Sequence, residues 1–202
     1  MFSKKNKQMN QNKGFSLIEL LITSAIITIV TAIVVVKHSA FNNAVLLKNQ
    51  AYEIALAMRE AQVYAVSSKG DESEFRERYG MYFSTGSASN RQKATVYINT
   101  KGSPNRFEGT DEELETIILD SRFEISDVCA DTVSSGEVCV RGNNNKASVS
   151  FKRPDFDPYF SLHDGSNYGG EVTAARIIIA PVSGSSITRT IEITQTGQIS
   201  VR

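Results

Sequence analysis

Three residues near the start of the chain, Gly14, Phe15 and Glu19, have types and spacing that could support chemistry. Glu19 is the single ionisable residue in the 22-residue run 15–36, which as a helix would be about 33 Å long and would span a bilayer core. A carboxylate in such a run is costly unless it has a partner. Cleavage after Gly14, where no Cβ obstructs a protease, would give Phe15 a free α-amine. That amine is cationic near neutral pH and could neutralise Glu19 of an adjacent copy.

The six residues 14–19 read GFSLIE and follow a short basic leader. This pattern resembles the class III signal of type IV prepilins and pseudopilins. The resemblance implies that a prepilin peptidase cuts after Gly14 and methylates Phe15, and that Glu19 acts in assembly and register at the fifth mature position. It also implies two further partners, namely other pilin or pseudopilin subunits and an inner-membrane assembly platform. The alternative is an ordinary single-pass anchor that happens to carry a glutamate.

The leader contains four lysines, at positions 4, 5, 7 and 13, ahead of the apolar run. This placement predicts a cytoplasmic leader and a C-terminal body outside the cytoplasm. A cleavable secretory signal peptide would need a small-x-small site after the apolar run, but residues 36–40 read VKHSA, with His38 in the wrong place for that site. We therefore expect a single-pass protein of the cytoplasmic membrane, surrounded by lipid before assembly and later found in a pilus or pseudopilus.

The charge balance changes when the leader is removed. The whole chain has 22 Lys+Arg and 22 Asp+Glu, and removing the four leader lysines leaves 18 against 22, a formal charge of −4. A mildly acidic body is not typical of a general nucleic-acid binder. A length of 202 residues allows one folded domain beyond the leader and stem.

Helical periodicity continues after residue 36, and no proline or glycine interrupts residues 15–69, which predicts one long helix that stops near Gly70. Its first half is apolar on every side and its second half is amphipathic, so one face of the second half must pack on something. The apolar stripe that recurs every three or four residues consists of Ala44, Leu47, Ala51, Ile54, Met58, Ala61 and Ala65. We expect four further residues to widen this stripe, namely Val45, Tyr52, Leu56 and Val63.

Two features favour a minor rather than a major pilin. The proline that major pilins usually carry at the twenty-second mature residue is replaced by Val36. Residues 56–69, LAMREAQVYAVSSK, and the C-terminal IEITQTGQISV resemble the H-type pseudopilin and minor pilin group. We expect the C-terminal stretch to form a hairpin, with Gly197 supplying the turn.

Beyond a charged connector, the chain consists of short β-rich segments separated by turn residues. The candidate strands are 80–84, 94–99, 115–119, 122–126, 137–141, 147–151, 159–162, 175–181, 189–194 and 198–201. Without helices between them, these strands predict antiparallel pairing. The fold class is therefore α+β, with a long N-terminal helix packed on an antiparallel sheet or a small β-sandwich. The expected segments are a cleaved leader (1–14), a transmembrane or filament-core helix (15–36), an amphipathic continuation (37–69) and a β-rich head (70–202).

The two cysteines, Cys129 and Cys139, favour a disulfide over a metal site, because His38 and His163 are the only histidines available to complete a ligand set. We expect the cysteines to flank a hairpin loop at 130–138 and to stabilise the fold by about 2 to 3 kcal/mol.

We find no convincing enzymatic constellation, and no cofactor or metal is expected. His163 and Asp164 lack the setting of a nucleophile elbow. The function that we predict is that of a structural subunit, a minor pilin or pseudopilin of a type IV pilus or a type II secretion pseudopilus. The alternative is a minor pilin that binds DNA for uptake, with phosphate contacts from Lys152, Arg153, Arg189 and Arg202.

Overall fold

The computed structural model describes most of the chain after the leader. Within it, only the backbone is described at residues 36–40 and at 163. The described residues are 14–67, 78–99, 107, 109, 111–133, 136–140, 146–152, 157–163, 172–184 and 186–202.

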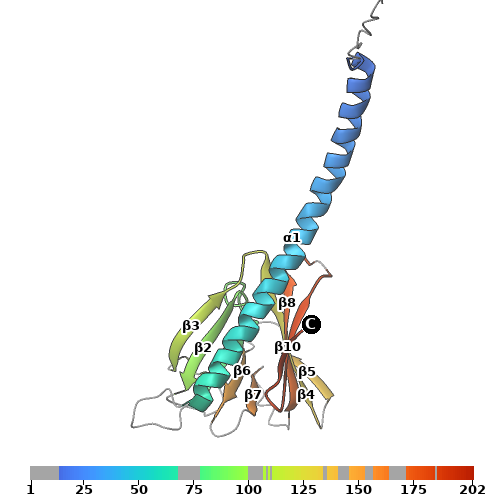
Figure 1. The fold of residues 1–202 in the computed structure, drawn as a ribbon. Coiled ribbons are helices and arrows are strands. Elements are labelled where there is room, and N and C mark those ends of the chain that lie inside the picture. Colours follow the sequence, from blue (N-terminus) through green and yellow to red (C-terminus); the bar gives the residue numbers. More distant parts are fainter. Residues whose placement is uncertain are drawn as a thin grey trace, which may run out of the picture. The chain divides into compact units, whose positions relative to one another are not determined.

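One helix, α1 (Leu17–Ser67, 51 residues), begins the structure (Figure 1). This confirms the prediction of a single uninterrupted helix, while the predicted stop at Gly70 lies outside the described residues. The chain divides into two compact units, Met1–Asn43 and Ala44–Arg202, with the boundary inside α1. The second unit contains the C-terminal half of the helix and both sheets.

The C-terminal half of α1 packs on the β-sheets with the face that the sequence predicted. Leu47, Ile54 and Met58 have no exposed surface and join one core cluster with residues of both sheets. The polar Gln62 is also buried, and its amide donates a hydrogen bond of 3.1 Å to the carbonyl oxygen of Gly197 in the C-terminal hairpin. This bond ties the helix to the end of the chain.

The expectation that four further residues widen the buried stripe is wrong. Val45, Tyr52, Leu56 and Val63 are 40%, 50%, 70% and 48% exposed. Their spacings of seven, four and seven residues place them on one helix face, because each residue advances about 100° around the axis. That face lies roughly opposite the one that contains Leu47. The helix therefore has a second apolar stripe that nothing in the described part of the unit covers.

All ten predicted strands are present, with differences at their ends. They are β1 (Arg78–Ser84), β2 (Lys93–Asn99), β3 (Glu112–Ile118), β4 (Phe123–Thr132), β5 (Gly136–Val140), β6 (Lys146–Phe151), β7 (Pro158–His163), β8 (Val172–Pro181), β9 (Arg189–Thr194) and β10 (Ile199–Val201). They form two five-stranded sheets with the orders β3-β2-β1-β6-β7 and β10-β9-β8-β4-β5. Each pair of neighbours is antiparallel, which confirms the α+β class.

The largest difference from the expected ends is in β4, which continues to Thr132 instead of ending at residue 126. Its pairing with β8 shifts register between Ile125 and Asp127. A bulge of this kind places an extra residue in one strand without ending the ladder. The loss of strict alternation at Ser126 and Asp127 is what made the strand look shorter.

The middle of the first sheet depends on a glycine. A Cβ added at Gly80 would lie 2.6 Å from the carbonyl oxygen of Val149 and 3.0 Å from Cε1 of Tyr97. The absence of a side chain lets the Tyr97 ring lie against β1, where it is fully buried and meets Phe107 edge-on at 5.1 Å between ring centroids. Burial raises the pKa of Tyr97 to about 12.

The C-terminal hairpin has the predicted turn. Gly197 has a φ of 77°, in the left-handed region that favours glycine. The amide of Gly197 donates a 2.9 Å hydrogen bond to the carbonyl oxygen of Thr194, which closes the turn between β9 and β10.

Candidate functional site

The predicted cleavage point lies in exposed backbone immediately before the helix. Gly14 and Phe15 are both exposed and neither belongs to α1. A Cβ added at Gly14 would meet nothing within 4 Å, so no described residue crowds the backbone at this position. A protease binds its substrate as unfolded backbone, and the peptide bond between the two residues is available without melting α1.

Ser16 determines where the helix begins. Its hydroxyl oxygen accepts a 3.3 Å hydrogen bond from the amide of Glu19, and its carbonyl oxygen accepts one of 3.2 Å from Leu20. Ser16 is therefore the N-cap. This role was not predicted from the sequence, although Ser-x-x-Glu is the signature of a capping box.

Glu19 has a local role at the helix start, while its pairing with a neighbouring chain stays a prediction. Its carboxylate lies in the first turn of α1 and is exposed. A negative charge in this turn is favourable because it faces the positive end of the helix dipole. The helix start therefore presents one exposed acidic group in its first turn.

The apolar part of α1 is long enough to cross a membrane. Residues Leu17–Val35 have a mean hydropathy of 2.5, and none of this segment is buried. Four hydroxyl side chains interrupt it, and each donates to a backbone carbonyl three or four residues earlier at 2.7 to 3.0 Å. They belong to Thr23, Ser24, Thr28 and Thr31. Because their donors are satisfied inside the helix, these residues are compatible with an apolar environment.

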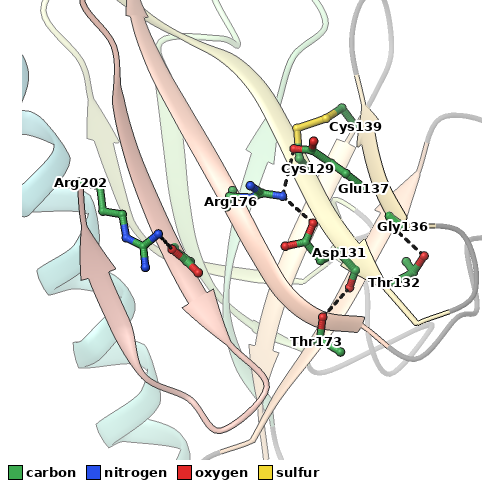
Figure 2. Close-up of polar contacts among 10 residues, drawn as sticks. Cys129, Asp131, Thr132, Gly136, Glu137, Cys139, Thr173, Arg176 and Arg202 are labelled. Carbon is green, nitrogen blue, oxygen red and sulfur yellow. Dashed lines mark hydrogen bonds and ion pairs between the residues drawn. A yellow bond between two sulfur atoms is a disulfide. The ribbon is translucent and has the colours of Figure 1, made fainter.

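The predicted DNA contacts are distributed between the two sheets. Arg189 begins β9, and its neighbour Thr190 exchanges two backbone hydrogen bonds with Arg202, at 2.8 and 3.0 Å. The structure therefore brings Arg189 and Arg202 to the same end of their sheet. The Arg202 guanidinium pairs with Glu192 at 3.1 Å (Figure 2). Lys152 follows β6 in the other sheet, and Arg153 lies outside the described residues.

Cys129 and Cys139 form a disulfide between directly opposite residues of β4 and β5, with a Cα–Cα distance of 3.9 Å. The loop that they were expected to flank is shorter than predicted, because β4 reaches Thr132 and β5 begins at Gly136. The two sulfur atoms lie near a Glu137 oxygen. Sulfurs joined to each other are not the thiolates that a metal ion binds.

A cluster of ion pairs beside the disulfide links β4 and β5 to a third strand, β8. Figure 2 shows Arg176 of β8 between Asp131 of β4 and Glu137 of β5, beside the disulfide. Its guanidinium forms ion pairs with both carboxylates, at 3.1 Å for Glu137. All three side chains are partly exposed, so this cluster supports the strand edge and has no feature of a catalytic site.

Of three comparisons with known proteins, one bears on the N-terminal segment. The type IV minor pilin FimU of Pseudomonas aeruginosa (strain PAO1) is similar to the chain with a TM-score of 0.41 and 13% identity, over 77% of this chain and 92% of that one. A likeness this distant supports no conclusion by itself. Among curated proteins, none matches significantly. The family model of the prokaryotic N-terminal methylation motif matches residues 9–35, the segment that contains Gly14, Phe15 and Glu19. The chain therefore carries a prokaryotic N-terminal methylation motif at residues 9–35, in agreement with the resemblance of its first residues to type IV prepilins.

Proposed function

We propose that the chain is a minor pilin or pseudopilin, a structural subunit that is cleaved between Gly14 and Phe15 and assembles through α1 into a type IV pilus or a type II secretion pseudopilus. The observation that carries the proposal is the arrangement of residues 14–19. An exposed Gly14–Phe15 bond directly precedes a capped helix, which has an acidic first turn and an uncovered apolar surface.

The physical argument concerns the surface of Leu17–Val35, which is exposed throughout. Such a surface is stable in lipid or among other apolar helices, but not in water. In lipid, Glu19 is penalised by about 2.5 kcal/mol or more at mid-bilayer and by less near the interface. Pairing with the α-amine of a neighbouring Phe15 removes this penalty, so assembly is favoured over dispersal in the membrane. The stripe that contains Tyr52 and Leu56 offers further apolar surface to neighbouring subunits.

Mass spectrometry of the mature N-terminus tests the processing step. In a host with its prepilin peptidase, we expect a peptide that begins at N-methylated Phe15; without the peptidase, we expect the leader to remain. A working chain that keeps Met1, or one that starts near Phe41, would contradict the proposal.

Glu19→Ala tests the pairing step. We expect the variant to be processed normally but to remain in the membrane and fail to enter filaments, as measured by immunoblotting of sheared filament fractions. Ser24→Ala, in the same apolar segment, is the matched control and should assemble. Normal assembly of Glu19→Ala would exclude the pairing.

DNA binding is the second candidate function, favoured by the proximity of Arg189 and Arg202 at one end of their sheet. A gel shift with the full chain in detergent tests it. If DNA binds, Arg189→Gln with Arg202→Gln should weaken binding and reduce its salt dependence. The absence of any shift at low salt would exclude this function.

A further inference from the structure

A groove lies between α1 and the first sheet, and it encloses about 340 Å³. On the helix side it is lined by Ala57, Glu60 and Tyr64. Tyr79 of β1 meets Tyr64 with 5.9 Å between ring centroids, so two aromatic rings form one wall. The groove therefore combines aromatic and aliphatic surface with a carboxylate at Glu60.

The opposite wall belongs to β2 and β3. Val96 and Ile98 of β2 line the groove, followed by Leu114 and Glu115 of β3. Leu114 is 42% exposed, and the wall that it forms is open to solvent. Glu115 is directly opposite Val96 in the strand register. Because directly opposite residues of an antiparallel pair share a face, the Glu115 carboxylate is on the α1 side of the sheet.

Among the described residues that line the groove, the charged ones are Glu60 and Glu115, and both are acidic. Within the part of the chain that the structure describes, neither carboxylate has an ion-pair partner. A cationic group that enters the groove would meet two acidic side chains and aromatic rings, which both attract cations.

The strand beside the groove has an unused edge. β3 is the last strand of its sheet and pairs, among the described strands, with β2 alone (Figure 1). The outer edge of such a strand presents backbone N–H and C=O groups to any extended segment that aligns with it. An extended peptide could therefore pair with β3 while its side chains enter the groove.

We propose that the groove between α1 and β3 binds an extended segment of a partner protein that carries arginine or lysine beside an apolar side chain. The basic side chain pairs with Glu60 and Glu115 while its methylene groups lie on Tyr64 and Tyr79. The apolar neighbour covers Leu114, and the backbone of the segment adds to the free edge of β3. The residues that line the groove all belong to the second unit, Ala44–Arg202, so the proposal goes beyond assembly through the apolar segment and does not depend on it.

Binding of a fluorescent peptide that alternates valine with arginine tests the proposal, with the full chain in detergent micelles. We expect saturable binding that weakens as salt is raised. Neutralising the pair with Glu60→Gln and Glu115→Gln should weaken binding at least about fivefold, because each lost ion pair changes the affinity severalfold. The same peptide with glutamate in place of arginine should not bind.

The matched control is Glu113→Gln. Glu113 is in the same strand but opposite Tyr97, with its side chain on the other face of the sheet, where it lines a separate pocket with Tyr82 and Lys93. We expect this variant to bind within about twofold of the original chain. Leu114→Ser tests the apolar contact without changing charge and should also weaken binding. Unfolding midpoints of all variants establish that each one is folded.

Three results would overturn the proposal. The first is equal binding of the acidic and basic peptides, and the second is unchanged binding when Glu60 and Glu115 are neutralised. Either would mean that the glutamates merely prevent unwanted sheet pairing at this edge. The third is a change in the oligomeric state of the chain on neutralising the pair without peptide, measured by sedimentation, which would assign the groove to a second copy of the chain.

Discussion

Two strands at sheet edges, β5 and β3, are held in opposite ways. β5 is joined to β4 by the Cys129–Cys139 disulfide, and Arg176 on β8 pairs with Glu137 across the intervening strand. The hydroxyl of Thr132 also donates a 3.0 Å hydrogen bond to the carbonyl oxygen of Gly136 where the two strands turn. Covalent, ionic and hydrogen-bonding links therefore all converge on one short strand.

β3 has fewer such links among the described residues. Its backbone pairs with β2, with a bulge between Val96 and Tyr97, and one side-chain link between the two strands is a 3.3 Å hydrogen bond between the hydroxyls of Thr95 and Thr116. Its exposed positions include three glutamates, at 112, 113 and 115. The comparison indicates that β5 is built to stay in place, whereas β3 is left accessible beside a groove.

The largest expected effect comes from removing the disulfide. Cys129→Ala with Cys139→Ala should lower the free energy of unfolding by about 2 to 3 kcal/mol, because the short closed loop no longer restricts the unfolded chain. Hydrogen exchange should then rise in β5 and stay unchanged in β3. If β5 amides remain as protected as before, the disulfide is not what holds this edge, and the contrast between the two strands fails.

The second effect concerns the centre of the sheet that carries β3. Gly80→Ala should destabilise the protein by about 1 to 3 kcal/mol, because the new Cβ would crowd the backbone oxygen of Val149, which cannot rotate away. Urea unfolding measures this change. In the uncleaved chain, Gly14→Ala is the control, since its Cβ meets nothing within 4 Å, and its unfolding midpoint should not move. If Gly80→Ala leaves the free energy of unfolding unchanged, the sheet that contains β3 is loosely packed at its centre as well as at its edge.

A smaller, pH-dependent effect involves Tyr97, the β2 residue opposite Glu113. Burial raises the pKa of Tyr97 to about 12 from its usual 10.0, so the folded state holds this proton more tightly than the unfolded state. The stabilisation is complete below pH 10 and is lost as the pH rises toward 12, which costs about 1 kcal/mol by pH 11.

Tyr97→Phe removes this titration. The difference in the free energy of unfolding between the original chain and the variant should therefore shift by that amount in favour of the variant between pH 9 and 11. The absorbance of tyrosinate provides an independent reading of the pKa. A parallel pH dependence in the two proteins would show that the Tyr97 site admits water from the β3 side.

The strand positions could be predicted from sequence because their evidence is local. Alternating side chains such as Ile177 and Ile179, together with turn residues such as Gly197, mark strands and turns within a few positions. The division into two sheets could not be predicted, since β1 pairs with the distant β6 and such pairings depend on the packing of the whole domain. The helix face of Leu56 was misassigned by counting apolar residues without tracking their angle around the axis.

The same distinction between local and long-range evidence applies to the candidate site. The residues predicted for cleavage and pairing, Gly14, Phe15 and Glu19, could be proposed from sequence because they lie within six positions of one another. The capping role of Ser16 likewise has a signature within four residues. The groove between Glu60 and Glu115 has no such signal, because its walls come from segments that only the fold brings together. The Arg176 cluster was missed for the same reason, since its carboxylates are on two other strands.

The smallest expected effect comes from that cluster. Arg176→Gln should lower the free energy of unfolding by about 0.5 to 1 kcal/mol, because ion pairs between partly exposed groups contribute little in water. The loss should shrink as salt is raised, and hydrogen exchange should increase in β5 while the disulfide stays intact. Arg122→Gln is the matched control, because the Arg122 side chain pairs with Asp120 two residues away, within the turn before β4; it should leave β5 exchange unchanged. If hydrogen exchange in β5 is as slow in Arg176→Gln as in Arg122→Gln, the ion pairs do not hold β5 in place. The difference between β5 and β3 would then come from the disulfide alone.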